Sequence, residues 1–383
     1  MIYLTNDTID NKDVDSLIEW LKTYPRLTKG PLTKEFEEKW SRWLGTKYSV
    51  YCNSGSSANL LMLYALIRAQ KLKNKKIVIP GLCWATDLAP ALQLEYEPIL
   101  CDVSLNTLSA DVTELENIFI EHNPAVFLCV SILGFSPDLK EIKRLCEKYD
   151  VILLEDNCES LGTEFEGSKI GTFGLMSSYS MYFGHHISTI EGGMVCTDDK
   201  DIYDILLSIR SHGWDRDWDK AKQEEVRTKH GITDFNSLYT FYHPGFNLRA
   251  TDLQAYIGLG QLDKLDWICK KREENFQKFQ EGIQNDFWKP QPLDDTFTSS
   301  FCYPVIHPKR NEIIKAIMEN DIEVRPLVCG TMGNQPFYVE KYGSQKLPNC
   351  DVIDQLGLYV PNNPSLTDDE INLIINTINK AIN

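Results

Sequence analysis

Short apolar runs recur along the first half of the sequence, and stretches with helical character lie between several of them. Short apolar strands that alternate with helices are typical of a mostly parallel sheet buried on both faces. In such a sheet, ligands bind beyond the carboxyl ends of the strands. We therefore expect an α/β fold with its functional residues at these ends. The expected strands are Tyr48–Cys52, Lys76–Pro80, Pro98–Cys101, Ala125–Val130, Val151–Glu155, Met176–Phe183 and Met194–Thr197, and the expected helices include Leu60–Lys71, Val112–His122 and Leu139–Tyr149.

The second half of the sequence has a different character. From about Asp201 to His243 the composition turns polar and charged, and part of this stretch reads as an irregular crossing segment that covers the substrate. A helical region from about Thr251 to Ile283 then leads into a smaller α+β part. We expect a large domain over residues 1–245 and a small C-terminal α+β domain over residues 246–383.

Charge and cysteine usage narrow the class of protein. The net charge is −16, from 39 basic and 55 acidic residues, which argues against a nucleic-acid or anionic-membrane partner. The polar start MIYLTNDTID does not read as a signal peptide, and no apolar run approaches a bilayer span, so we expect a cytoplasmic protein. The 11 cysteines form no CxxC pair, and we expect them to be reduced and structural, with no metal site.

The segment Asn53-Ser54-Gly55-Ser56-Ser57 joins an expected strand to an expected helix. Free backbone N–H groups at a helix start bind phosphate, and glycine lets the chain approach it closely. A helix start capped by a serine side chain is an equally good reading of this segment alone.

Asp156 follows directly on the apolar strand Val151–Glu155. A carboxylate at that place is costly unless it is paired, and a protonated pyridine nitrogen is a suitable partner. The alternative is an aspartate that caps the next turn. Its neighbour Glu155 is also acidic, but alternation along a strand turns it to the other face.

Two further segments carry side chains suited to a flat, phosphorylated ligand. Trp84 follows another strand and is placed either to stack on an aromatic ring or to pack in the core. Ser180 precedes the pair His185-His186, and its hydroxyl suits a phosphate oxygen. Adjacent residues of an extended segment point apart, so the two histidines do not share a metal ion. We expect His185 to face the ligand as a general base, from its register with Ser180 and Glu191. A solvated loop histidine is the alternative when this segment is taken alone.

In this order and spacing, the motifs resemble the sugar aminotransferase family of fold-type-I pyridoxal-phosphate (PLP) enzymes, the DegT/DnrJ/StrS group. The resemblance covers nearly the whole chain, from Leu27-Thr28-Lys29-Gly30-Pro31-Leu32-Thr33 to Glu323-Val324-Arg325-Pro326. It implies an aspartate-aminotransferase-like α/β fold with a mostly parallel seven-stranded sheet. It also implies a homodimer with shared active sites.

The resemblance assigns a role to each motif. Gly55, Ser56, Ser57 and Ser180 would contact the cofactor phosphate, and Asn247, in Gly245-Phe246-Asn247-Leu248-Arg249, would reach it from the neighbouring subunit. Trp84 would stack on the cofactor ring, and Asp156 would pair with its nitrogen. The family's usual lysine, which binds the cofactor aldehyde covalently, is replaced here by His185.

An imidazole can move protons but cannot bind the aldehyde as an amine does, so simple amino transfer is not expected. The string from Gly184 to Gly193 is very similar to a dehydratase branch of the family that acts on nucleotide-linked 4-keto-6-deoxysugars. That likeness implies a cycle in which L-glutamate converts PLP to pyridoxamine phosphate (PMP). His185 then moves a proton, the C3 hydroxyl leaves, and ammonia is released. A sugar aminotransferase with an unusual base and a catalytically inactive ligand-binding homologue are the alternatives.

The resemblance favours a GDP-linked substrate, either a hexose such as GDP-4-keto-6-deoxymannose or a 6-deoxyheptose. The sequence itself shows no nucleotide-binding motif. Arg325 is a candidate for contact with the sugar or its phosphates, and His212 is a candidate residue of the substrate loop.

Overall fold

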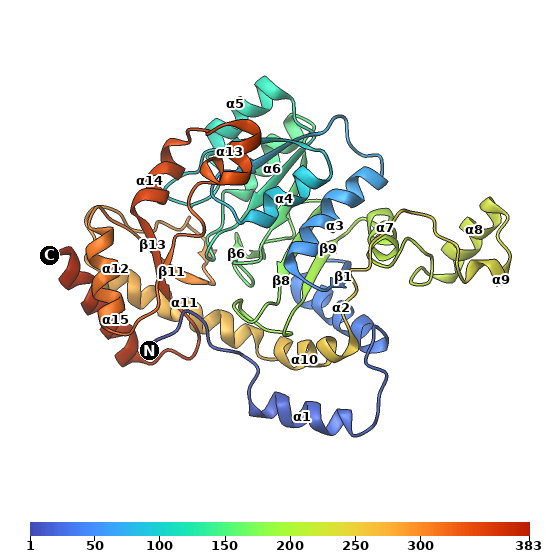
Figure 1. The fold of residues 1–383 in the computed structure, drawn as a ribbon, viewed down its shortest axis with the longest axis horizontal. Coiled ribbons are helices and arrows are strands. Elements are labelled where there is room, and N and C mark those ends of the chain that lie inside the picture. Colours follow the sequence, from blue (N-terminus) through green and yellow to red (C-terminus); the bar gives the residue numbers. More distant parts are fainter.

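The computed structural model describes residues 1–383, and a seven-stranded sheet lies at its centre (Figure 1). The strand order is β1-β9-β8-β5-β4-β2-β3, and only β9 runs antiparallel to its two neighbours. The mostly parallel sheet expected from the sequence is therefore confirmed. Its strands are β1 (Tyr48–Cys52), β2 (Lys76–Pro80), β3 (Glu97–Cys101), β4 (Val126–Val130), β5 (Ile152–Asp156), β8 (Met176–Ser180) and β9 (Gly193–Thr197).

Helices cover both faces of this sheet, as its apolar strands require. On one face α3 packs on β8 and β9 and contacts α4 and α7, and on the other face α2 packs on β1 and α6 packs on β5. The helices are α1 (Asn11–Leu21), α2 (Pro31–Leu44), α3 (Gly55–Arg68), α4 (Ala85–Gln93), α5 (Val112–His122), α6 (Leu139–Lys148), α7 (Lys200–Arg210), α8 (Lys220–His230), α9 (Asp234–Ser237), α10 (Asp252–Leu262) and α11 (Leu265–Gly282).

The start of α3 differs from the expected one. The helix begins at Gly55 rather than at Leu60, because the Ser54 side chain accepts a hydrogen bond from the Ser57 N–H and caps the first turn. The strand expected to reach Phe183 ends at Ser180. Both shifts place Gly55 and Ser180 at the ends of regular elements.

The charged stretch from Asp201 to His243 is more regular than expected. Its first part is α7, which buries Ile202, Leu206 and Ile209 in the core. The rest forms an arm that carries α8 and α9 and projects from the body of the molecule (Figure 1). α8 buries no residue, and its ends are satisfied locally by the Asp219 side chain and by Gly231 in the left-handed conformation.

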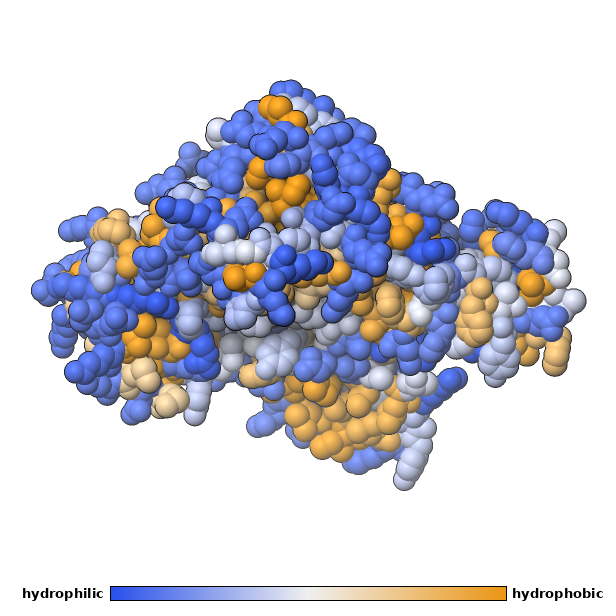
Figure 2. Space-filling view, turned by 45° about the horizontal axis from the view of Figure 1, so that its top comes forward, coloured by the Kyte–Doolittle hydropathy of each residue, from blue (hydrophilic) through white to orange (hydrophobic).

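The N-terminal helix α1 leaves an apolar face uncovered. Val14, Ile18 and Leu21 lie on one side of this helix and are 36–46% exposed, while Trp20 stacks on Tyr256 of α10. Figure 2 shows an apolar patch at the lower edge of the molecule, where α1 lies. No helix in the structure is long and apolar enough to cross a membrane.

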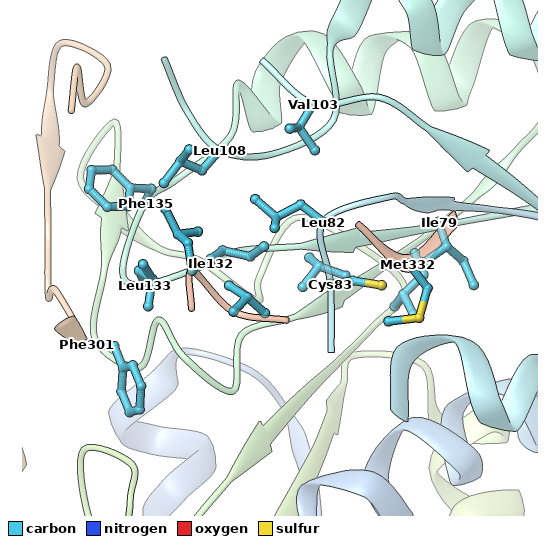
Figure 3. Packing of buried hydrophobic residues seen from close by; sticks show 14 of the residues in the cluster. Ile79, Leu82, Cys83, Val103, Leu108, Ile132, Leu133, Phe135, Phe301 and Met332 are labelled. Carbon is cyan, nitrogen blue, oxygen red and sulfur yellow. The ribbon is translucent and has the colours of Figure 1, made fainter. Parts of the chain in front are cut away.

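The C-terminal part forms an α+β layer around a three-stranded sheet of order β11-β13-β12. One hydrophobic core runs from the large sheet into this layer, and Figure 3 shows Leu82 and Ile132 of the large sheet's loops near Phe301 and Met332. The elements of this part are β11 (Cys302–Ile306), α12 (Arg310–Glu319), β12 (Arg325–Pro326), η1 (Met332–Asn334), α13 (Pro336–Tyr342), α14 (Pro348–Leu356), β13 (Gly357–Pro361) and α15 (Asp368–Ile382); β6 (Glu164–Phe165), β7 (Ser168–Lys169) and β10 (Thr296–Phe297) form a small separate sheet.

Candidate active site

A cavity of about 550 Å³ opens at the carboxyl ends of the parallel strands, where an α/β sheet places its ligands. Loops after β1, β2, β4, β5 and β8 line most of it, and the C-terminal layer closes one side. The lining residues predicted from the sequence are Gly55, Ser56, Trp84, Asp156, Ser180 and His185.

One corner of the cavity is formed by the start of α3 and the end of β8. A Cβ atom on Gly55 would lie 2.6 Å from the Cβ of Ser180, so only glycine fits there without a shift. The Ser54 side chain caps the Ser57 N–H at 3.1 Å, which leaves the N–H groups of Gly55 and Ser56 free at the helix start. These donors and the Ser180 hydroxyl can hold a phosphate. Ser57 does not line the cavity.

A second corner holds two buried carboxyl groups and no basic side chain paired with them. Asp156 accepts hydrogen bonds from the side-chain amide of Asn59 (2.5 Å) and the N–H of Cys158 (2.8 Å). The same Asn59 amide donates to Asp87 at 3.0 Å. Burial, followed by the charge of Asp156, raises the pKa of Asp87 well above its ordinary value. Such a pair lacks a cation, and the protonated ring nitrogen of PLP would supply one.

Glu155 points to the opposite face of β5, as strand alternation predicts. Its carboxylate accepts hydrogen bonds from the N–H groups of Gly171 (2.6 Å), Phe173 (2.8 Å) and Gly174 (2.6 Å). Glu155 therefore holds the loop before β8 and has no contact with the cavity.

The two adjacent histidines separate as predicted. His185 lines the cavity, and its Nδ1 atom has no hydrogen-bond partner in the chain. Removal from water lowers the pKa of His185 to about 4, although the charge of Asp156 opposes that shift. The imidazole is thus neutral near pH 7 and can accept a proton. His186 is fully buried, and its Nε2 atom lies 3.0 Å from the carbonyl oxygen of Ser299.

Trp84 stands on the cavity wall with 56% of its surface exposed, so the alternative of a core tryptophan is wrong. The backbone N–H of Trp84 donates to the Asp87 carboxylate at 2.9 Å, and this hydrogen bond fixes the start of α4. The exposed ring is free to stack on a flat ligand.

Several lining residues carry no recognisable signal in the sequence. Glu159 lies one turn beyond Asp156 and accepts a hydrogen bond from the Leu133 N–H at 3.1 Å. Burial raises the pKa of Glu159 to about 7. Phe301 and Tyr359 come from the C-terminal layer, where nothing in the local pattern marks them as site residues. Of these three residues, Glu159 alone stands in a segment that already held a predicted site residue.

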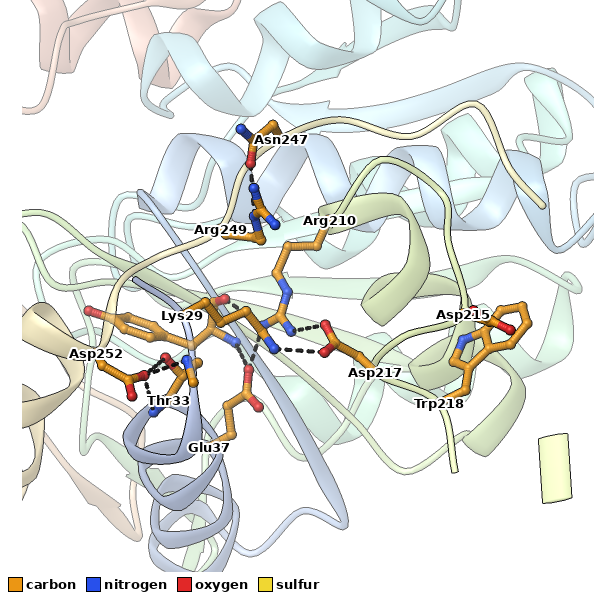
Figure 4. Close-up of polar contacts among 12 residues, drawn as sticks. Lys29, Thr33, Glu37, Arg210, Asp215, Asp217, Trp218, Asn247, Arg249 and Asp252 are labelled. Carbon is orange, nitrogen blue, oxygen red and sulfur yellow. Dashed lines mark hydrogen bonds and ion pairs between the residues drawn. The ribbon is translucent and has the colours of Figure 1, made fainter. Parts of the chain in front are cut away.

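Three predicted residues lie away from the cavity of their own chain. Asn247 is exposed at the base of the arm, where its side-chain oxygen accepts a hydrogen bond from Arg249 Nε at 3.0 Å (Figure 4). His212 belongs to the same region, since its N–H donates to the Phe246 carbonyl at 2.6 Å. Arg325 on β12 is exposed and ion-paired with Glu323, opposite Tyr359 of the cavity wall.

Taken together, the cavity fits PLP. At one corner, the free N–H groups of the α3 start and the Ser180 hydroxyl suit the phosphate. At another corner, the buried carboxyl groups of Asp87 and Asp156 have no basic partner and suit the protonated ring nitrogen. The exposed indole of Trp84 suits the flat ring.

Proteins similar to this chain include PLP-binding enzymes. The chain is 32% identical to the GDP-4-keto-6-deoxy-D-mannose 3-dehydratase of Yersinia pseudotuberculosis, over 98% of each chain. Two crystal structures of GDP-4-keto-6-deoxymannose-3-dehydratase are also similar, each with a TM-score of 0.90, 30% identity, and coverage of 99% of this chain and 100% of the other. One is a histidine-to-asparagine variant with bound GDP-perosamine, and the other contains a trapped PLP-glutamate geminal diamine.

These matches extend over nearly the whole chain and confirm the aspartate-aminotransferase-like fold expected from the sequence. The family model of the DegT/DnrJ/EryC1/StrS aminotransferases matches residues 7–379. The chain therefore belongs to the DegT/DnrJ/EryC1/StrS aminotransferase family.

Proposed function

We propose that the protein is a PLP/PMP-dependent 3-dehydratase of a nucleotide-linked 4-keto-6-deoxysugar, with GDP-4-keto-6-deoxymannose or a 6-deoxyheptose analogue as substrate. L-Glutamate is the amino donor, ammonia is released, and the product is a 3,6-dideoxysugar. One observation carries this proposal: the cavity presents the imidazole of His185 where the family has an amine. The relatives named above support the substrate and the amino donor.

The bound cofactor supplies an amine that condenses with the sugar ketone and a ring that accepts electrons. Gly55, Ser56 and Ser180 hold its phosphate, and Asp156 keeps its ring nitrogen protonated. Asn59 positions Asp156 by a 2.5 Å hydrogen bond, and the Ser178 hydroxyl orients Asn59 in turn at 2.6 Å. These contacts would hold Asp156 in place for the ring nitrogen.

In this mechanism the His185 imidazole would accept a proton and then donate it to the C3 hydroxyl, which would leave as water. The lowered pKa keeps the imidazole in its neutral, proton-accepting form before substrate binds. Nδ1 has no partner in the chain, so the ring is free to orient toward the reacting atoms. Without an amine at this position, the cofactor stays non-covalently bound between turnovers.

We further propose a homodimer in which Asn247 of each subunit completes the phosphate site of the other. Asn247 is exposed and lies outside its own cavity, which suits a residue that acts across an interface. The bare apolar face of α1 and the exposed aromatic side chains of the arm offer surface for such an interface.

A nucleotide-sugar aminotransferase is the second candidate, because the family includes sugar-nucleotide transaminases. A catalytically inactive ligand-binding homologue is the third. In the aminotransferase, His185 would have to serve as the unusual base, and the inactive homologue gives no role to an unpartnered histidine that faces the cavity.

The test uses purified protein with PLP, L-glutamate and GDP-4-keto-6-deoxymannose, with products followed by mass spectrometry and an ammonia assay. We expect loss of the 3-hydroxyl together with formation of ammonia and 2-oxoglutarate, and we expect His185→Asn to abolish all three. An intact 4-amino sugar would establish the aminotransferase instead. The absence of any product, with PLP bound, would favour the inactive homologue.

A further inference from the structure

Arg272 is a buried cation that no carboxylate compensates. It lies on α11 with 1% of its surface exposed. Burial lowers the pKa of Arg272 to about 10, so the guanidinium is still charged near pH 7. One terminal nitrogen donates to the carbonyl oxygens of Phe301 and Asn362, each at 2.7 Å, and the Nε atom has no acceptor. The guanidinium is therefore held by carbonyl dipoles alone.

The other fully buried arginine shows how this chain compensates such a charge. Arg210 pairs with Glu37 at 2.5 Å and with Asp217 at 3.2 Å. Arg272 has no such partner, although a guanidinium removed from water without an anion is unfavourable for stability. A cation retained under these conditions points to a role other than stabilisation of the fold.

The residue that Arg272 holds is Phe301, which lines the active-site cavity. The Phe301 N–H donates to the carbonyl oxygen of Leu133 at 3.0 Å, so the backbone is fixed at both its N–H and its carbonyl (Figure 3). The centre of the Phe301 ring lies 5.9 Å from the Arg272 guanidinium and 5.5 Å from the centre of the His185 ring. One anchored side chain thus connects Arg272 to the proposed base.

Packing sets the orientation of the His185 imidazole, because its Nδ1 atom has no hydrogen-bond partner. Two aromatic rings lie beside it. The Phe301 ring is inclined to the imidazole by 38°, and the Tyr182 ring lies 6.4 Å away at an angle of 75°. Tyr182 is 43% exposed, whereas Phe301 is buried and anchored. Phe301 is therefore the fixed member of the pair.

Acidic groups dominate the other surroundings of the imidazole. Four carboxyl groups line the same cavity, those of Asp87, Asp156, Glu159 and Glu191, and no lysine or arginine lines it. The remaining titratable neighbours are Cys158, Tyr182, Tyr359 and the buried His186. An ionised carboxylate favours the protonated imidazole, as Asp156 does, and the Arg272 cation opposes it.

We propose that Arg272 is a positioning residue for His185: it anchors Phe301 beside the imidazole and, as an unpaired cation, opposes protonation of the ring before substrate binds. This inference rests on the proposed function, because that function assigns the proton transfer to His185. A neutral ring can accept a proton near pH 7, and a protonated ring beside a cation gives its proton up readily to the leaving C3 hydroxyl.

The primary test measures the proton affinity of His185 in the cofactor-free protein and requires no turnover. Labelling with 13C at Cε1 gives one NMR signal for each of the seven histidines, and the His185 signal is the one lost in His185→Asn. We expect Arg272→Gln, which keeps an N–H donor but removes the charge, to make His185 bind its proton about tenfold more tightly. Arg272→Lys keeps the charge and should stay within about twofold of the wild type.

Asn275→Ala is the matched control. Asn275 is a fully buried residue of α11 that donates to the Asn363 carbonyl at 3.2 Å and carries no charge. Its loss should lower stability but leave the proton affinity of His185 within about twofold of the wild type. Unchanged proton affinity in Arg272→Gln, or an equal increase in Arg272→Lys or Asn275→Ala, would overturn the proposal.

Kinetics of Phe301→Leu test the anchored contact without a change at Arg272. We expect kcat for dehydration to fall by about tenfold or more, with a smaller change in KM, because the imidazole loses its fixed neighbour. A change in KM alone would show that Phe301 only contacts the substrate, and an unchanged kcat would overturn the anchoring. These results decide the proposal if Arg272→Gln does not fold.

The pH profile separates the charge of Arg272 from its structural role. In Arg272→Gln the acidic limb of the kcat profile should move to higher pH, and Arg272→Lys should restore it. A lower kcat with an unmoved acidic limb would mean that Arg272 only supports the fold. If the wild type performs no dehydration while Arg272→Gln still changes the proton affinity of His185, the proposed reaction fails and the action of Arg272 on His185 stands.

Discussion

The burial of His185, as well as its imidazole side chain, determines which protonation state residue 185 has near pH 7. The half-buried imidazole has a pKa of about 4, below the ordinary value of about 6.5. Because the folded state prefers the neutral ring, its contribution to stability is complete above about pH 6.5 and is lost as the pH falls toward 4.

We therefore expect His185→Asn to flatten the loss of stability between pH 6.5 and pH 4 relative to the wild type, by about 3 kcal/mol at the acid end. Urea unfolding at a series of pH values measures this difference. His186 titrates in the same direction and remains in both proteins, so the comparison isolates residue 185. Parallel curves for the two proteins would show that His185 is solvated in the folded state.

Asp156 shares its buried site with the carboxyl group of Asp87. Without a bound cation, this arrangement lowers the stability of the protein. We expect Asp156→Asn to lower PLP affinity by about tenfold or more, since the ring nitrogen loses its charged partner. The melting temperature of the cofactor-free protein should stay the same or rise, since one buried charge is removed. Equilibrium dialysis with PLP and thermal denaturation of the apoprotein measure the two effects separately.

Glu155→Gln is the matched comparison on the other face of β5. Its carboxylate accepts three backbone hydrogen bonds, so we expect a loss of about 1–3 kcal/mol in stability with PLP affinity retained. The opposite pattern, with Glu155 controlling PLP affinity, would reverse our assignment of the two acids.

At the scale of single elements, α2 depends on a residue far away in the sequence. Asp252 is buried and accepts hydrogen bonds from the Gly30 N–H (2.7 Å), the Thr33 N–H (3.0 Å) and the Thr33 hydroxyl (2.7 Å). It caps the start of α2, where Gly30 itself has no side chain to do so. The element that covers β1 is therefore completed by the start of α10.

We expect Asp252→Ala to lower the free energy of unfolding by about 2–4 kcal/mol, because four donors, two of them in buried hydrogen bonds, lose their acceptor. Asp252→Asn retains one acceptor oxygen and should lose less. Guanidinium unfolding followed by circular dichroism measures both variants. Equal losses in the two would mean that the negative charge, rather than hydrogen bonding, stabilises this helix start.

At the scale of the whole molecule, a buried ion network joins the arm to the sheet. Arg210 is fully buried and pairs with Glu37 of α2 at 2.5 Å and with Asp217 of the arm base at 3.2 Å (Figure 4). It also donates to the carbonyl oxygen of Tyr51 at 2.7 Å, and Lys29 pairs with Asp217 at 2.8 Å. The network fixes where the arm leaves the body.

We expect Arg210→Met to cost about 3–5 kcal/mol in stability, because Glu37 keeps a buried charge without its partner. The double variant Arg210→Met with Glu37→Gln should recover part of that loss, which a urea-unfolding cycle of the four proteins would measure. Additive losses would show that the two side chains do not interact.

The alternation of apolar strands and helices, read from the sequence alone, predicted the parallel sheet and the edge at which the site lies. Strand periodicity separated Asp156 from Glu155, because a one-residue step along β5 reverses the side chain. The histidines also point apart, but they lie in a turn after β8 and not in the extended segment that the prediction assumed. The helical structure of the arm was missed, because α8 depends on end caps rather than on a buried stripe.

The order of motifs determined the family, the cofactor and the exchange at residue 185, since each of these depends on residue identity and spacing along the chain. Only the tertiary structure showed the acid pair of Asp87 and Asp156 and the closing of the cavity by Phe301 and Tyr359. These features join residues from separate segments of the chain. Their proximity, and the burial that shifts their charges, is produced by packing, which local sequence patterns do not encode.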